Sequence, residues 1–337
     1  MIKPLFAPED KSLLLSAVAL DMLLICQRRG FALDTLLKGS KVFEQDLHKA
    51  TCKISPQQYL QLVSNCQKLW PGPELAYLTA QSWLHHNHSP LLLMLRYSAN
   101  LQQALAAFWR YRFLLLPLFY IRLQRIEGQL RLILRPSFEL GKQQPFIEQL
   151  ILFYLLGLVQ QQLGKVSGLG LHLQTNDPQQ SWLCQLHWQL EPQPSLQSCL
   201  SLPLQLLDQS FLEADAKLWQ QQKNWCDYLK QSMPVKAALP EQLEQWLFLQ
   251  LRQPPSQEEA ARYAGVSLSS FKRLLAQHHT SYLQLLDQVK ACAAQQALLV
   301  QGMSNKELAS RLGYSDEHNF RRAFKRWTGL LPSQLRS

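Results

Sequence analysis

The sequence lacks the cysteine spacings that are typical of a zinc knuckle or a redox pair. Its seven cysteines stand far apart, and their number is odd. This pattern excludes a disulfide framework and indicates small buried side chains in a reducing compartment. One histidine-rich stretch, HHNH at 85–88, offers transition-metal ligands. Adjacent histidines at a helix end point in different directions, so we expect a polar loop there and no metal site.

Long hydrophobic runs are missing as well. The apolar runs at 113–121 and 150–159 are about half of the ~20 residues that a membrane-spanning helix needs. The N-terminal stretch MIKPLFAPEDKSLLL lacks the charged, apolar and small-residue order of a signal peptide. These absences predict a soluble cytoplasmic protein without a membrane partner.

Catalytic patterns are also absent. No nucleophile stands with a base and an orienting group in a recognisable motif, and no glycine-rich loop suits a phosphate. The sequence therefore predicts no enzyme, no cofactor and no metal. An enzymatic N-terminal part remains a third alternative, which turnover by the purified domain would revive.

What the chain does have is enough apolar material for two domains. It counts 337 residues, 47% of them hydrophobic. The net charge of +10 is a mild indication of a polyanionic partner. Residues 233–240 hold two prolines and follow a helical pattern at 211–231. We predict an effector-sensing or dimerisation domain at 1–232, a linker at 233–240 and a DNA-binding domain at 241–337.

An internal repeat marks the second domain. The stretch from Ala260 to Gly265 has the spacing of the stretch from Leu308 to Gly313. Each glycine is followed by a residue that can cap a new helix, namely Ser267 in the first copy and Ser315 or Asp316 in the second. Each copy therefore predicts a helix, a tight turn and a second helix.

The second helix of each copy has two chemically different faces. At 100° per residue, Phe320, Phe324, Trp327 and Ala323 share one side, and His318 and Arg322 lie opposite. In the first copy, the inward set is Phe271, Leu274, Leu275 and His278, and Ser269 and Arg273 take the outward positions. The aromatic side predicts an anchor in the domain, and the cationic side predicts an exposed surface.

An exposed helix with arginine, lysine, asparagine and serine suits the DNA major groove, where arginine bridges guanine acceptors. We assign Arg273 and Arg322 to base edges, with Ser269, Ser270, His318 and Asn319 as helpers. Lys272, Arg321, Lys325 and Arg326 are assigned mainly to phosphates. The alternative is a merely solvated helix face, which the repeated helix-turn-helix context disfavours.

The segment between the copies, at 281–300, contains good helix formers and no glycine or proline. Twenty helical residues span ~30 Å, close to the ~34 Å between successive major-groove windows on one face of DNA. One chain should therefore bind double-stranded DNA at two unlike half-elements about one turn apart.

The C-terminal part of the sequence resembles a known family. Residues from about 254 to 336 are similar to the DNA-binding domain of AraC/XylS bacterial transcription regulators, above all in MSNKELASRLGYSDEHNFRRAFKRWTGLLPSQLR. Leu335 departs from the pattern, which usually has an aromatic residue there. The resemblance implies seven helices with two helix-turn-helix units, a regulator that is usually an activator, and contact with RNA polymerase at promoters.

The first 232 residues predict an α+β effector domain, followed by the all-α DNA-binding domain with two helix-turn-helix units joined by a long helix. The predicted helices and strands of the first domain are as follows. Helical patterns occupy 10–29, 55–69, 73–86, 100–115, 144–164 and 211–231, and strand-like patterns occupy 119–126, 129–135, 168–175 and 185–190. The order resembles the arabinose-binding-like N-terminal domain of one branch of the family, chiefly at 86–117 and in the helix after Phe146. That resemblance implies a small-molecule effector.

Residues 109–123 mix cations with many apolar groups, which would suit an anionic amphiphile in a pocket. The candidate effector-binding residues are Arg110, Arg112, Tyr120 and Arg122. The alternative is a packed helix and strand whose arginines reach solvent. A second functional hypothesis makes this domain a ligand-free module for protein interaction or dimerisation, which would allow a homodimer.

Overall fold

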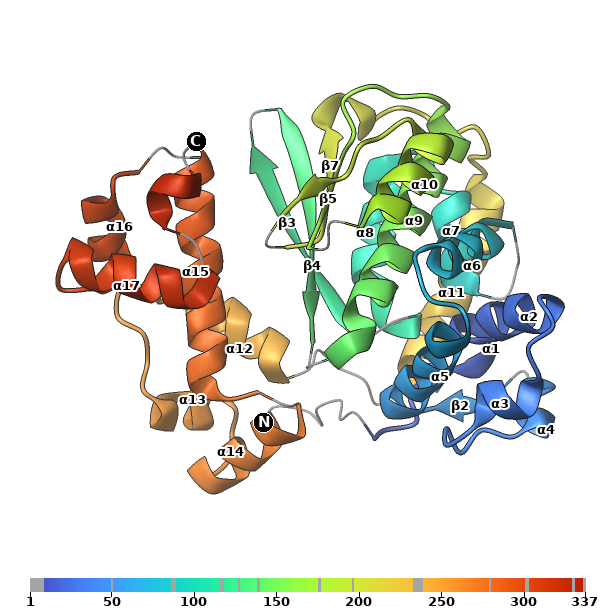
Figure 1. Ribbon diagram of the computed structural model, residues 1–337, viewed down its shortest axis with the longest axis horizontal. Coiled ribbons are helices and arrows are strands. Elements are labelled where there is room, and N and C mark those ends of the chain that lie inside the picture. The colour runs from blue at the N-terminus through green and yellow to red at the C-terminus, as the bar shows by residue number, and fades with distance from the viewer. Residues whose placement is uncertain are drawn as a thin grey trace. The chain divides into compact units, whose positions relative to one another are not determined.

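The structure is a computed structural model. It describes residues 9–49, 51–85, 89–115, 118–126, 128–137, 140–174, 177–195, 197–232, 239–278, 280–300, 303–328 and 331–335. Two compact units divide the chain, one built mainly from 8–136 and 140–235 and the other mainly from 236–337 (Figure 1). Most of the linker predicted at 233–240 lies outside the described residues, so the domain boundaries stay a prediction.

The N-terminal unit surrounds one long core helix with shorter helices and a sheet. Its helices are α1 (Leu15–Val18), α2 (Leu20–Arg28), α3 (Leu33–Leu37), α4 (Glu44–Leu47), α5 (Pro56–Leu69), α6 (Glu74–His85), α7 (Pro90–Arg96), α8 (Leu101–Tyr111), α9 (Gln144–Leu163), α10 (Pro178–Trp188) and α11 (Ala216–Ser232), with 3-10 turns at Arg112–Leu114, Gly141–Gln143 and Leu204–Leu206.

The strands form a mixed sheet and a small separate pair. They are β1 (Leu13–Leu14), β2 (Lys53–Ile54), β3 (Phe119–Ile126), β4 (Gln129–Pro136), β5 (Gly170–Leu173), β6 (Gln193–Pro194) and β7 (Cys199–Pro203). The sheet order is β3-β4-β7-β5-β6, and only the β5–β6 pair is parallel among the described pairs. The strands predicted at 119–126 and 129–135 are confirmed, and they form an antiparallel hairpin with Ile126 opposite Gln129. The predicted α+β class is confirmed too.

Helix α9 forms the centre of this unit. Apolar side chains lie on all sides of this helix, and most of its 20 residues are buried. It is the one helix of the described chain that is long and apolar enough to cross a membrane, but 78% of its apolar window is buried inside the protein. It packs against α6, and a methyl group added at Gly157 would lie 2.4 Å from the side chain of Leu84. These properties are those of a core helix.

One predicted strand is wrong. Residues 185–190 belong to α10 and to its C-terminal cap. The helix prevails because Asp177 accepts a hydrogen bond from the backbone N–H of Gln179 at 2.9 Å, and Pro178 stands in the first turn. Gln189 then ends the helix in a left-handed conformation, with φ at 54°.

Other boundaries shift for similar local reasons. The helix predicted at 211–231 begins at Ala216 because Asp215 caps the N–H groups of Lys217 and Leu218. The central strand β7 was not predicted, since four of its five residues are buried and the run shows no polar alternation.

The C-terminal unit is helical in its described residues, as predicted. It contains α12 (Leu239–Phe248), α13 (Gln257–Tyr263), α14 (Leu268–Gln277), α15 (Tyr282–Val300), α16 (Asn305–Arg311), α17 (Glu317–Thr328) and a 3-10 turn at Pro332–Leu335. The predicted long helix between the repeats is α15, which runs through the unit in Figure 1. Side chains from all six α-helices meet in one hydrophobic core.

Candidate DNA-binding surface

The repeat extends to the hydrogen bonds that begin each helix-turn-helix unit. At the start of α13, the N–H of Glu259 donates to Oγ of Ser256 at 3.1 Å, and the Glu259 carboxylate accepts from the Ser256 N–H at 2.6 Å. Ser304 and Glu307 repeat both bonds at α16, at 3.2 and 2.7 Å. These two capping boxes satisfy N–H groups that an uncapped helix would leave unpaired.

Each turn depends on a glycine in the left-handed region. The φ angles of Gly265 and Gly313 are 71° and 74°. At Gly313 a Cβ atom would lie 2.5 Å from the backbone carbonyl oxygen of Arg252. Because that neighbour is backbone, no side-chain rotation relieves the contact.

The two outward helices, α14 and α17, have different caps. Oγ of Ser267 accepts from the N–H of Ser270 at 3.3 Å, whereas Oδ1 of Asp316 accepts from the N–H of Asn319 at 2.7 Å. The second cap is therefore Asp316 and not Ser315. Hydrogen bonds from the Asn319 N–H and the Ser315 hydroxyl hold the pKa of the Asp316 carboxyl below its ordinary value.

The predicted inward faces are confirmed. Phe271, Leu275 and His278 of the first unit are buried. In the second unit, Phe320 and Phe324 are fully buried with ring centroids 5.7 Å apart, and the Tyr314 ring packs at 6.2 Å from Phe320. These contacts fix both helices to the core and leave their opposite sides free to face outward.

The predicted outward faces are confirmed as well, although their contact with DNA stays a prediction. The exposed candidates are Ser269, Lys272 and Arg273 on α14, and His318, Asn319, Arg321, Arg322, Lys325 and Arg326 on α17. Ser270 is half-buried, and its hydroxyl accepts from the Ser267 hydroxyl at 3.0 Å. The Nδ2 group of Asn319 donates to Ser315 and Asp316 at 3.0 and 2.8 Å. Ser270 and Asn319 thus serve the caps first.

One cation differs from the others. The Arg326 Nη2 atom lies 3.1 and 3.0 Å from the two carboxylate oxygens of Asp287 on α15. Within the described residues, no other arginine or lysine among the DNA-binding candidates has an ion-pair partner. No local pattern in the sequence indicates this pair, because the two residues are 39 positions apart.

Among the effector candidates, the two described side chains, Arg110 and Arg112, make separate contacts. Arg110 lies on the surface, 3.8 Å from the Asp227 carboxylate, which also accepts from the Tyr111 hydroxyl at 2.5 Å. Arg112 donates to the Trp109 carbonyl at 2.8 Å. The side chains of Tyr120 and Arg122 lie outside the described residues, and so do residues 86–88 of the histidine stretch. In the part of the chain that the structure describes, no three His, Cys, Asp or Glu side chains could hold a metal ion.

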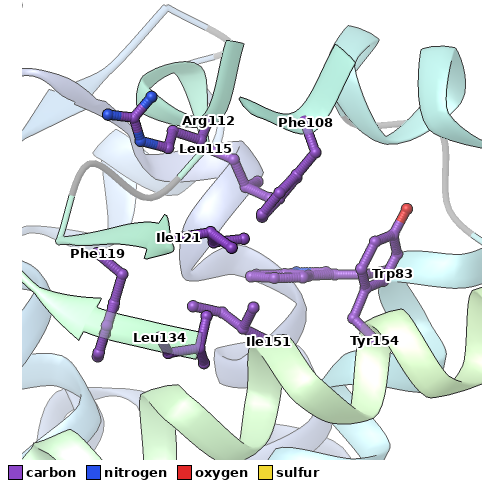
Figure 2. A pocket seen from close by; sticks show the side chains of 9 residues that line it. All are labelled: Trp83, Phe108, Arg112, Leu115, Phe119, Ile121, Leu134, Ile151 and Tyr154. Carbon is purple, nitrogen blue, oxygen red and sulfur yellow. The ribbon is translucent and has the colours of Figure 1, made fainter. Parts of the chain in front are cut away.

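Arg112 does border a small cavity. Its lining side chains belong to Trp83, Phe108, Arg112, Leu115, Phe119, Ile121, Leu134, Ile151 and Tyr154. The charged end of Arg112 points away from the enclosed rings and aliphatic groups (Figure 2). About 10 Å³ of space remains, enough for one water molecule. The cavity is therefore apolar and nearly filled.

Comparisons with known proteins agree with this geometry. Residues 260–337 match a helix-turn-helix domain family, and residues 30–208 match the arabinose-binding domain of AraC transcription regulators, N-terminal. The ornithine utilization regulator of Pseudomonas aeruginosa is 34% identical over 137 residues, which are 41% of this chain and 40% of that protein. The HTH-type transcriptional regulator VqsM of the same species is 32% identical over 85 residues, 25% of this chain and 26% of that protein.

The alignments thus span about two fifths or less of these relatives. The crystal structure of the transcriptional regulator CdpR from Pseudomonas aeruginosa superposes with a TM-score of 0.40 at 19% identity, over 83% of this chain and 90% of that one. The curated relatives are transcription regulators and not enzymes. Because one family description covers more than half of the sequence and the other covers the repeat, the chain belongs to the AraC family of transcription regulators, with a helix-turn-helix DNA-binding domain after an arabinose-binding-type domain.

Proposed function

We propose that this regulator binds double-stranded DNA sequence-specifically by placing α14 and α17 in successive major grooves. The observation that carries the proposal is the two-faced construction of both helices, with buried aromatic anchors on one side and exposed cations on the other. Helix α15 joins the two helix-turn-helix units, and its 19 residues correspond to ~28 Å. That length is compatible with the ~34 Å between adjacent groove windows on one face of the duplex.

The residue roles follow from position on each helix. Arg273 and Arg322 stand in the centre of the exposed faces and are proposed to read base edges. Ser269 and His318 stand beside them as helpers. Ser270 and Asn319 contribute from positions that the caps already fix. Lys272, Arg321 and Lys325 are proposed to neutralise phosphates.

Footprinting on a selected DNA site tests the proposal directly. We expect two protected windows about one helical turn apart. The Lys325→Ala variant should weaken binding to cognate and random DNA alike, and binding by the wild type should fall steeply with salt. A single protected window, or none, would refute two-groove binding.

We further propose that the chain acts in the cytoplasm as a promoter-bound activator that contacts RNA polymerase. The family's DNA-binding domain supports a role at promoters. In vitro transcription from a template that carries the mapped site should rise on addition of the protein. Transcription that falls instead would make the protein a repressor.

For the effector, we propose a small molecule whose apolar part enters the cavity between α6, α8, α9 and the β3–β4 hairpin. The rings of Trp83 and Phe108 and the side chain of Ile151 give an apolar lining. Since little space is left, the ligand must displace these side chains. The ornithine named for one relative is charged at both ends and fits this lining poorly.

Thermal unfolding of the full chain tests the effector class. Medium-chain fatty acids and the matching alcohols should raise the melting temperature, because a ligand that binds only the folded state stabilises it by ~2.7 kcal/mol at 100 times its Kd. An acid that binds more tightly than its alcohol would indicate that Arg112 takes part. The Ile151→Ala variant, with a larger cavity, should respond more strongly to bulky probes. A shift with ornithine alone would contradict the proposal.

A second candidate function for the N-terminal unit is dimerisation without a ligand, which the exposed side of α11 favours. Leu218, Trp225 and Tyr228 have exposed fractions of 37%, 52% and 63%. With Gln221 they follow the 3-4-3 spacing of a coiled-coil seam, which suits a second copy of the same helix. Trp225→Glu should convert a dimer into a monomer in sedimentation experiments, and Trp182→Glu on α10 is the matched control. Monomeric wild type would exclude this candidate.

A further inference from the structure

Arg326 stands on the flank of α17 that faces α15. Its Nη2 atom contacts both carboxylate oxygens of Asp287, at 3.1 and 3.0 Å. The Arg326 side chain is 66% exposed and the Asp287 side chain 38%. The pair therefore joins α17 to α15 at the edge of the proposed DNA-binding surface.

A second contact joins α15 to the second helix-turn-helix unit. Lys290 follows Asp287 by three positions, so both side chains lie on one side of α15. The Lys290 Nζ atom lies 4.6 Å from the ring centroid of Tyr314 in the turn, and Lys290 is only 9% exposed. Tyr314 in turn packs on Trp327 at 6.0 Å. Two separated contacts, one at the turn and one near the end of α17, restrict rotation of that helix on α15.

The pair also changes what Arg326 offers to DNA. A guanidinium whose charge is balanced by a carboxylate 3.0 Å away attracts a phosphate less than an unpaired cation does. Lys325, on the opposite flank of α17, has no ion-pair partner among the described residues. The two neighbouring cations are therefore electrostatically unequal.

We propose that Arg326 is a positioning residue, which with Asp287 fixes the orientation of α17 on α15 and does not neutralise a DNA phosphate. This inference rests on the proposed role of α17 in reading DNA. It replaces the phosphate contact expected for Arg326 from the sequence. The repeat makes the proposal specific, because Gln277 occupies the corresponding position on α14 and carries no charge. Loss of the pair should therefore weaken binding only at the half-site that α17 reads.

The test uses the full chain and the salt dependence of its DNA affinity. Each phosphate contact contributes ~0.9 to the slope of log affinity against log salt concentration. We expect Lys325→Ala to lower the slope by ~0.9. Arg326→Ala should leave the slope unchanged and weaken cognate binding about two- to fivefold, in keeping with a partly exposed ion pair. Base changes in the half-site read by α17 should then cost Arg326→Ala less than they cost the wild type.

Two further variants separate positioning from direct contact. Asp287→Ala should weaken cognate binding as Arg326→Ala does. The charge swap of Asp287→Arg with Arg326→Asp should recover part of the affinity that Arg326→Asp alone loses, because the pair is restored with its ends exchanged. Melting temperatures of all variants confirm that they fold.

Two results would overturn the proposal. One is a slope that falls by ~0.9 in Arg326→Ala, as in Lys325→Ala. The other is tighter binding with a steeper slope in Asp287→Ala, since a freed Arg326 would then be reaching a phosphate. If Lys325→Ala and Arg322→Ala also leave DNA binding unchanged, the role of α17 in DNA binding fails, which is a separate outcome.

Discussion

The first helix-turn-helix unit exposes two cations on its outward helix, Lys272 and Arg273, whereas the second exposes four, Arg321, Arg322, Lys325 and Arg326. Their buried faces are alike, since Phe271 and Leu275 occupy the places of Phe320 and Phe324. The same packing thus holds two surfaces of different charge. We infer that the second unit supplies most of the electrostatic affinity, and that the first adds sequence selectivity at a second groove.

The largest expected effect tests whether the buried faces of α14 and α17 are equivalent. Phe271→Ala and Phe320→Ala should each lower the free energy of unfolding of the C-terminal unit by ~3–5 kcal/mol, because each removes a fully buried ring. Urea unfolding, followed by circular dichroism, measures both. Leu283→Ala is the control, since Leu283 is 70% exposed and should change the free energy by less than ~0.5 kcal/mol. A large difference between the two phenylalanine variants would break the comparison.

The next effect concerns the two central arginines. Arg322→Ala and Arg273→Ala should each weaken binding to the selected site by ~1–3 kcal/mol and change binding to random DNA far less, since a base contact carries sequence information. Competition binding on sites with one altered half-site measures both. Arg322→Ala should relax selectivity in one half-site, and Arg273→Ala in the other. Equal losses on selected and random DNA would show that these arginines bind phosphates.

A smaller effect tests whether the two helix-turn-helix units differ in DNA binding only because of their charge. Ala276 is exposed on α14 at the position that Lys325 occupies on α17. Ala276→Lys should add one phosphate contact, steepening the salt dependence by ~0.9 and tightening binding to all DNA sequences. Equilibrium binding at several salt concentrations measures it. An unchanged slope would mean that the two helices approach the duplex differently.

The fold of the second domain could be predicted from the sequence because the residue patterns that specify it are local. The glycine turns, the capping serines and the period of Phe320, Phe324 and Trp327 all act within one or two helical turns. The Asp287–Arg326 pair was not readable, since it depends on how α15 and α17 pack. In the N-terminal unit, the mixed residue pattern at 109–123 left two alternatives, a pocket with cations among apolar groups and a packed helix and strand whose arginines reach solvent. The contact of Arg110 with Asp227 and the small cavity lined by rings and aliphatic groups depend on packing between distant residues, for which the sequence has no local signal.

The smallest expected effect lies in the caps of the two outward helices. Asp316 caps α17 as a carboxylate, and its pKa is lowered by hydrogen bonds from the Asn319 N–H and the Ser315 hydroxyl. A carboxyl with a lowered pKa in the folded state stabilises above its unfolded pKa, and this contribution is lost as the pH falls through its folded pKa. Ser267 caps α14 with a hydroxyl that does not titrate in this range.

Below about pH 4, where an unfolded aspartate begins to bind its proton, the second unit should therefore lose a stabilising contribution that the first retains. Asp316→Ser should flatten the acid side of the curve of melting temperature against pH, with little change at pH 7, because serine caps nearly as well as aspartate. Ser267→Asp should steepen the same side. The capping-box carboxylates Glu259 and Glu307 are present in both units and cancel in this comparison. If both variants keep the wild-type acid profile, the cap of α17 does not control its acid stability.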